Sequence, residues 1–302
     1  MPWIEAKKKH RDALREFALR REWEHVTFSN KLKEYLKDQR IFFFSHENPF
    51  PTSLKTLLRL PNEHKSEYHI SNSFMLTRFG ILLPILYEKN REILYGLKNH
   101  LSSLHNKMFS IIGTKEDVQF TSSILPEQPH TVVDYYLMLL SSKEFDNEKP
   151  IQQDYGETGK FSLKIKLAHP REAKYLFPLQ RDYELEEVVL KKANYNPKFS
   201  LAMFRKNLEE NIVLYAELDG TPVAKAGTNA RGFITDQIGG VFTKRDQRGK
   251  GIARIVMKYL LSLIFEDKQY ASLFVKKHNL PAINLYKSLG FKIVNDFRIA
   301  YF

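Results

Sequence analysis

The chain of 302 residues contains no cysteine. Disulfide bonds, thiolate zinc sites and cysteine nucleophiles are therefore excluded. The sequence also lacks an H-x-x-x-H pair, a G-x-S-x-G motif and any carboxylate cluster with metal-ligand spacing. We expect no bound metal and no hydrolase chemistry of these kinds.

Long apolar runs are absent as well. The longest, residues 81–87, is far shorter than the roughly 20 residues that a membrane-spanning helix needs. Residues 1–17 have the pattern of a charged amphipathic helix and lack the apolar segment of a signal peptide. We expect a cytoplasmic protein without a membrane partner.

Acidic residues are scarce relative to basic ones, and the formal net charge is +12. Residues 1–150 carry 22 basic and 19 acidic side chains, whereas residues 151–302 carry 25 and 16. The excess in the second half is concentrated around one glycine-containing loop, which favours a compact phosphate ligand. Because no zinc, helix-turn-helix or RNP-like pattern is present, we expect no nucleic-acid partner.

The length is sufficient for about two domains. Residues 1–150 predict a small α/β domain without a chemical motif, and the polar stretch 141–160 lacks periodicity and is interpreted as the boundary. Residues 161–302 predict the order β-α-α-β-β-β-α-β-α-β-β.

Three local signals in the second half can be compared directly with a structure. Asp219-Gly220 lies between two strand-like runs and predicts a type I′ hairpin. Pro178 is expected to interrupt a helix. Two strands are expected to close the chain, separated at residues 295–296.

The strongest chemical signal is the basic loop between a predicted strand at 236–243 and a predicted helix at 251–265. Residues 243–258 hold six lysines or arginines and one acid, although a helix start normally favours acidic residues. Glycines let a backbone approach an anion closely, and the free N–H groups of the helix start then point at it. A solvated basic turn, with glycines required only by its geometry, is the alternative. The anion-binding residues predicted here are Arg248, Gly249, Lys250, Gly251, Ile252 and Ala253.

Two motifs in this half resemble those of the GCN5-related N-acetyltransferases (GNAT). The pattern [Arg/Gln]-x-x-Gly-x-[Gly/Ala] matches at residues 248–253, and Asn-x-x-Ala-x-x-x-Tyr-x-x-x-Gly-Phe matches at residues 279–291. The resemblance covers residues 161–302. The chain also resembles a two-domain bacterial group of this superfamily, in which an N-terminal domain of unassigned role precedes the transferase domain.

The resemblance implies a GNAT acyl-CoA N-acyltransferase fold of the α/β class for residues 161–302. It leaves residues 1–150 as a smaller α/β domain that either shapes the acceptor side or is a degenerate GNAT-like copy. By the same resemblance, the basic loop would hold the pyrophosphate of acetyl-CoA. The main chain of Val241, Phe242 and Thr243 would pair with the pantetheine arm, and one N–H would bond the thioester oxygen.

Tyr286 is the candidate general acid for the departing thiolate. Its position on an apolar helix face with Ala282, Leu285 and Leu289 leaves open that it is only a core residue. Asn279 is expected to bind the cofactor arm, to cap the following helix, or both.

The general base is less clearly marked. Members of the family often carry a glutamate on the strand that corresponds to residues 236–243, where this chain has Gly239 and Gly240. Asp236, at the start of that strand, is the nearest carboxylate and the candidate base. The glutamates in the first helical region are alternatives, although each could belong to a solvated helix face, and relayed water is another: Glu184, Glu186 and Glu187.

These observations predict an N-acetyltransferase that moves an acetyl group from acetyl-CoA to an unidentified amine acceptor by direct attack in a ternary complex. A non-catalytic acyl-CoA-binding regulatory module is the alternative. The missing strand glutamate favours that alternative, and the retained Tyr286 argues against it. A longer acyl donor or an aminoacyl-transfer-RNA donor is a third possibility, but a transfer-RNA donor would not need the pyrophosphate loop.

Overall fold

The computed structural model describes residues 3–33, 39–46, 68–102, 108–145 and 163–302. The chain forms two compact units. Unit 1 comprises Met1–Leu137, Phe274–His278 and Val294–Phe302, and unit 2 comprises Met138–Leu273 and Asn279–Ile293. Most of the predicted boundary at 141–160 lies outside the described residues, so the domain limits 1–150 and 161–302 stay a prediction.

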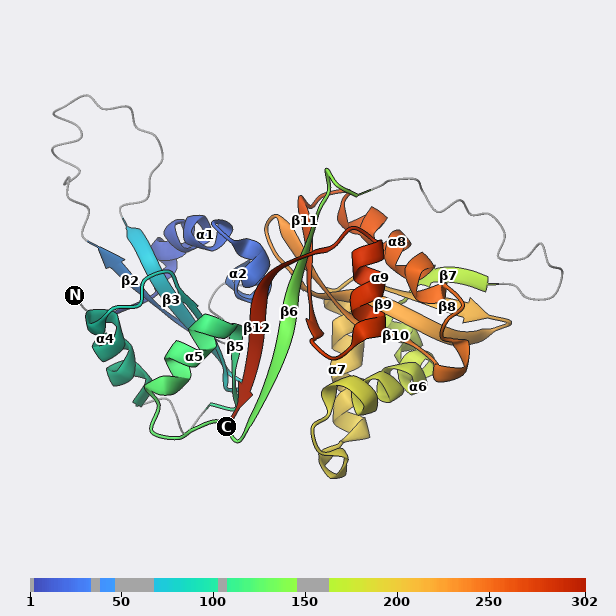
Figure 1. The fold of residues 1–302 in the computed structure, drawn as a ribbon, viewed down its shortest axis with the longest axis horizontal. Helices are drawn as coiled ribbons and strands as arrows, with labels where there is room; N and C mark the ends of the chain where they lie inside the picture. The colour runs from blue at the N-terminus through green and yellow to red at the C-terminus, as the bar shows by residue number, and fades with distance from the viewer. Residues whose placement is uncertain (1–2, 34–38, 47–67, 103–107, 146–162) are drawn as a thin grey trace. The chain divides into compact units, whose positions relative to one another are not determined.

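Unit 1 is a mixed sheet with helices (Figure 1). Its strands follow the order β1-β2-β3-β4-β5-β12. Neighbours are antiparallel except for the parallel pair β4 and β5. The elements that precede residue 142 are β1 (Ile4–Glu5), α1 (Arg11–Leu19), α2 (Val26–Lys33), β2 (Gln39–His46), β3 (His69–Thr77), β4 (Ile81–Leu86), α4 (Arg91–Ser102), β5 (Ser110–Thr114), α5 (Lys115–Ser123) and β6 (Thr131–Ser141).

Aromatic side chains pack together within a largely aliphatic core in unit 1. Phe42 and Phe74 stack with ring centroids 4.9 Å apart, and Trp3 packs against Phe74 at 5.2 Å. Helix α5 begins after a Thr114 cap, whose hydroxyl accepts a hydrogen bond from the Asp117 N–H at 3.2 Å.

Unit 2 contains the strand order β11-β10-β9-β8-β7. The pair β10 and β11 is parallel and the other pairs are antiparallel. Helices α6 and α7 lie on one side of β8–β10, and α8 lies on the other (Figure 1). The elements that follow residue 162 are β7 (Leu163–Leu167), α6 (Ala173–Tyr183), a π-helical turn (Glu184–Val188), α7 (Pro197–Glu210), β8 (Val213–Leu218), β9 (Thr221–Arg231), β10 (Thr235–Thr243), α8 (Ile252–Ile264), β11 (Tyr270–Lys276), α9 (Leu280–Ser288) and β12 (Lys292–Tyr301).

The order of elements repeats along the described chain. A strand, two helices, three strands, a helix, a strand, a helix and a strand occur from β1 to β6 and again from β7 to β12. The pairing pattern repeats too. Three antiparallel strands lead to a parallel neighbour in β2-β3-β4-β5 and in β8-β9-β10-β11.

The hairpin prediction is confirmed, because Asp219 and Gly220 have φ values of 48° and 78°, as a type I′ turn requires. The predicted break at Pro178 is wrong, since α6 runs through it. Pro178 and Lys174, whose carbonyl loses its partner, are both exposed, so water can satisfy that carbonyl.

The expected division of the last strand is also wrong. Residues 292–301 form one strand, β12. Asn295 and Asp296 are not followed by a glycine and do not have positive φ values. Instead Asn295 donates to Glu24 at 3.0 Å and Asp296 pairs with Lys277 at 2.7 Å, so both polar side chains are held without a turn.

Candidate active site

The strand β10 carries a bulge at the two glycines that precede Val241. Gly239 pairs with Gly227 of β9 and Phe242 pairs with Lys225, so two residues of β10 face one residue of β9. Gly240 has a φ of 62°, which glycine adopts without strain. A Cβ on Gly239 would lie 1.8 Å from the amide nitrogen of Asn229. Of the two glycines that stand where the strand glutamate was expected, Gly240 therefore has a conformational reason, whereas the exposed Asn229 side chain could move away from a Cβ on Gly239.

Beyond the bulge, β10 separates from β11. The parallel register between them runs from Thr235↔Tyr270 to Ile238↔Leu273 and goes no further. Pairing with β9 continues to Thr243↔Ala224. One edge of residues 239–243 is therefore open, and Val241, Phe242 and Thr243 line a cavity there.

The basic loop turns into α8 with two glycines in the left-handed region. Gly249 and Gly251 both have φ of 77°, and Gly251 is the N-cap of α8 without a side-chain cap. In the hydrogen bonds found among the described residues, the five backbone N–H groups from 249 to 253 have no acceptor. Free N–H groups at a helix start form a ready anion site.

The arginine of the motif is held by the protein itself. Arg248 donates from Nε to the Thr243 carbonyl at 3.0 Å and forms an ion pair with Glu186 at 2.7 Å. Glu186 also pairs with Arg245 at 3.0 Å. Although burial raises the pKa of Glu186, the two guanidinium groups hold it below the ordinary glutamate value, so Glu186 is an anion at neutral pH.

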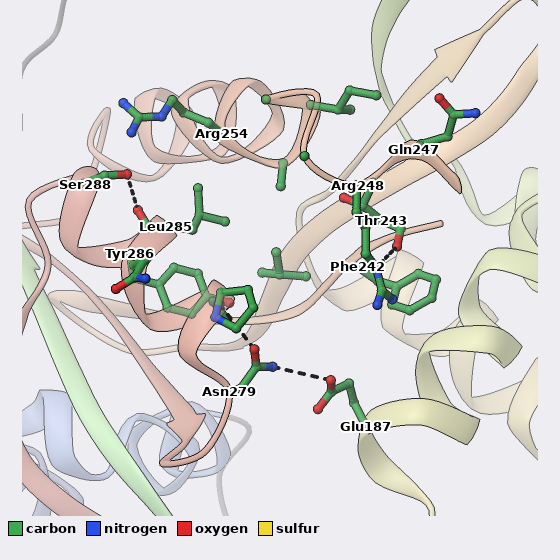
Figure 2. Close-up of a pocket in the computed structure, with 18 of the residues that line it drawn as sticks. Glu187, Phe242, Thr243, Gln247, Arg248, Arg254, Asn279, Leu285, Tyr286 and Ser288 are labelled. Carbon is green, nitrogen blue, oxygen red and sulfur yellow. Dashed lines mark hydrogen bonds between the residues drawn. The ribbon is translucent and has the colours of Figure 1, made fainter. Parts of the chain in front are cut away.

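The cavity has a volume of about 550 Å³, within the range of small-molecule sites. It lies between the start of α8, the open edge of β10, the π-helical turn and α9 (Figure 2). The Oγ1 atom of Thr243, which lines it, is buried without a hydrogen-bond partner among the described residues. The free N–H groups at the start of α8 fit a phosphate-bearing ligand.

Tyr286 and Asn279 line the same cavity from α9 and its start (Figure 2). Burial raises the pKa of Tyr286 well above the ordinary phenol value, helped by nearby Glu187, so the hydroxyl keeps its proton. The Asn279 Oδ1 atom accepts from the Ala282 N–H at 3.2 Å, and its Nδ2 donates to Glu187 at 3.4 Å. Asn279 thus caps α9, as predicted, and also contacts a cavity residue.

The structure brings most of the predicted site residues together at this cavity. They are Val241, Phe242, Thr243, Arg248, Gly249, Gly251, Ile252, Ala253, Asn279 and Tyr286.

Two of the predicted site residues do not line this cavity. Lys250 is exposed and donates to Gln247 at 2.9 Å. Asp236 is fully buried at the other end of β10, where it accepts from Arg231 at 2.9 Å, and burial raises its pKa.

Lys225 is a buried residue near the bulge that sequence reasoning missed. Only 5% of it is exposed, and its Nζ donates to the Gly240 carbonyl at 2.7 Å. The available signal was a lysine flanked by alanines within a strand between apolar neighbours, a pattern that is unusual for a solvent-facing position.

The Acetyltransferase (GNAT) family model matches residues 175–291. Among solved structures, a Drosophila protein aligns with 99% of this chain and 98% of its own length at 9% identity and a TM-score of 0.64. A tandem GNAT protein from the clavulanic acid biosynthesis pathway aligns with 92% of this chain and 94% of its own at 12% identity and a TM-score of 0.51.

A third solved structure is a GNAT-family acetyltransferase from Novosphingobium aromaticivorans. It matches 57% of this chain at 18% identity and a TM-score of 0.39, and this chain spans 65% of that protein's length. No curated protein matches the sequence. At such identities the Drosophila and tandem GNAT structures support the fold alone. Residues 175–291, which hold the open strand edge, the glycine loop and Tyr286, thus match the model of the GNAT acetyltransferase family.

Proposed function

We propose that the protein is an N-acetyltransferase that moves an acetyl group from acetyl-CoA to an amine in a ternary complex. The observation that carries the proposal is the cavity in which a glycine loop with free N–H groups lies opposite a buried, protonated tyrosine. The cosubstrate would supply an activated thioester. The N–H groups of residues 249–253 would hold its pyrophosphate, and the open edge of β10 would hold its pantetheine arm.

Tyr286 serves as the general acid in this proposal. Loss of a thiolate requires a proton, and a phenol that remains protonated at neutral pH can donate one from its hydroxyl. The 7% exposure of Tyr286 does not separate the two interpretations, because a core residue and a catalytic acid in this cavity would both be buried.

Glu187 is the carboxylate that we assign to the acceptor amine. It lines the cavity, lies near enough to Tyr286 to affect its titration, and is linked to Asn279 at 3.4 Å. A carboxylate at this place can attract a cationic amine and accept the proton that the amine loses on attack. Asp236, bonded to Arg231 and absent from the cavity lining, has no part in this proposal.

We further propose that unit 1 is a GNAT-like copy without a cofactor site. The connection from β4 to α4, residues 87–90, contains no glycine. At this connection the Lys89 ammonium and the Leu86 N–H both bind the Asp117 carboxylate, at 2.9 Å and 3.3 Å. The start of α4 is capped by Asn90, which accepts from the Ile93 N–H at 3.0 Å. These three groups, which lie where a phosphate would be met in a site like that of α8, are thus bonded to protein side chains.

The test is release of free thiol from acetyl-CoA in the presence of a panel of amines, with calorimetric binding of acetyl-CoA measured in parallel. We expect Tyr286→Phe to bind acetyl-CoA as the wild type does and to lose roughly 10²- to 10⁴-fold in rate. Binding without thiol release from any amine would favour the regulatory module. Failure of the wild type to bind would refute both functions.

A further inference from the structure

The buried lysine of β9 has no role in the function proposed above. Lys225 is enclosed by Tyr183 of α6, with Nζ 4.4 Å from the ring centroid, and its strand neighbours are Tyr215 of β8 and Phe242 of β10. No ion pair to it is found among the described residues. A buried ammonium without a paired carboxylate is costly to stability, so we expect Lys225 to have a role beyond packing.

Lys225 makes its hydrogen bond to one peptide group of the bulge. Its Nζ donates to the Gly240 carbonyl at 2.7 Å. The described chain contains no cis peptide bond, so the Gly240–Val241 peptide is trans, and its C=O and N–H point in opposite directions. With the carbonyl held toward Lys225, the Val241 N–H must point to the other side of β10.

The open edge of β10 begins at the same place. Strand β10 no longer pairs with β11 after Ile238, and Val241 lines the cavity there, whereas Lys225 does not. Under the proposed function the acyl carbonyl of the cosubstrate would lie along this edge, and the Val241 N–H, turned away from Lys225, is the backbone donor that we assign to it.

We propose that Lys225 is a positioning residue that fixes the Gly240–Val241 peptide and so aims and strengthens the Val241 N–H as hydrogen-bond donor to the acyl carbonyl. A charge on a group that bonds the peptide oxygen polarises the peptide and makes its N–H a stronger donor. This inference rests on the proposed function, because it needs an acyl thioester in the cavity.

The protonation of Lys225 makes the inference measurable. Burial lowers its pKa to about 7, while the Glu184 carboxylate at the end of α6 acts in the opposite direction. The two tyrosines around it stay neutral: burial raises the pKa of Tyr183 to about 12 and that of Tyr215, which bonds Glu172, further still. The ammonium form is present below the pKa and is lost as the pH rises through it, so the donor is strongest on the acid side.

The experiment uses acetyl-CoA labelled with ¹³C at the thioester carbonyl and bound to the full-length protein, because the carbonyl resonance reports its hydrogen bond and needs no acceptor. We expect a downfield shift on binding that is larger at about pH 6 than at about pH 8.5, two values on either side of the lysine titration. Lys225→Met should bind the cosubstrate within roughly threefold of wild type but lose the shift. Lys225→Arg, always charged, should keep a shift that does not vary with pH.

The control is Lys206→Met, which removes an exposed lysine of α7 paired with Glu210 at 3.3 Å. It should behave as wild type. An unchanged shift in Lys225→Met, or a wild-type shift independent of pH, would overturn the inference while leaving the proposed function intact. If Lys225→Met does not fold, the pH dependence of the wild type decides alone. Absence of acetyl-CoA binding by the wild type would refute the proposed function, and this inference with it.

Discussion

The anion site at the start of α8 can be tested by one pair of substitutions that differ only in charge. Gly249 has a φ of 77°, and a Cβ built on it meets nothing within 4 Å. Asn and Asp are the side-chain-bearing residues that adopt this region most readily. Gly249→Asn and Gly249→Asp should therefore fold alike, and Gly249→Asn is the matched neutral control.

The loss of affinity expected for Gly249→Asp follows from Coulomb's law. A carboxylate about 5 Å from one phosphate charge, at an effective dielectric constant of about 40, is repelled by about 1.7 kcal/mol, which is roughly a 15-fold loss of affinity. A second phosphate charge nearby raises the loss to roughly 100-fold. The Asn variant should lose only a few-fold, because it adds bulk without charge.

Calorimetric titration with acetyl-CoA measures both variants directly. The difference between Asp and Asn should shrink at high salt, because the loop is exposed and ions screen exposed charges. Equal affinities for the two variants at low salt would show that the loop does not hold the phosphates, and the case for an anion site at α8 would fail.

Three further predictions concern other parts of the chain. Calorimetry should give one acetyl-CoA per chain, because Lys89 and Asp117 satisfy the corresponding groups in unit 1; two sites would contradict the proposal for that unit. Glu186→Gln should bind acetyl-CoA a few-fold more tightly in the same assay, because it removes an anion from the cavity wall and frees Arg248; weaker binding would mean that Glu186 chiefly orients the arginine. Burial raises the pKa of Asp236, so the folded state favours its protonated form, and stability should fall as the pH rises through the window between its ordinary and its raised pKa. Asp236→Asn should remove this slope, at most about 1.4 kcal/mol per pH unit, in urea unfolding curves measured across that window; an unchanged slope would assign it to other groups.

Local signals in the sequence predicted many of the residues that line the candidate cavity. The glycines of residues 249–251 and the Asn279 cap depend on backbone geometry within a few residues, which a sequence pattern can report. The type I′ hairpin at Asp219-Gly220 is predictable for the same reason.

The contacts that complete the site join residues far apart in the chain. Glu186 meets Arg248 across 62 positions, and Glu187 meets Asn279 across 92. Their sequence pattern is that of a solvated helix face, and only the π-helical turn at the end of α6 brings them to the cavity. The burial of Lys225 likewise depends on α6 packing over the sheet, which no periodicity within β9 reveals.

Most of β12 belongs to unit 1, and this restricts how the protein can be divided into fragments. Residues 297–301 pair with β5 of unit 1, although they follow the last helix of unit 2 in the chain. A cut between residues 145 and 163 would leave the amino-terminal fragment with an uncovered β5 edge, and an exposed strand edge invites aggregation. Two separately expressed halves should thus be poorly soluble alone and recover when mixed, so fragment complementation is the suitable approach to dissecting them. Gene rearrangements that transplant only residues 163–302 into another protein would meet the same obstacle, since they carry away a strand that the other half requires.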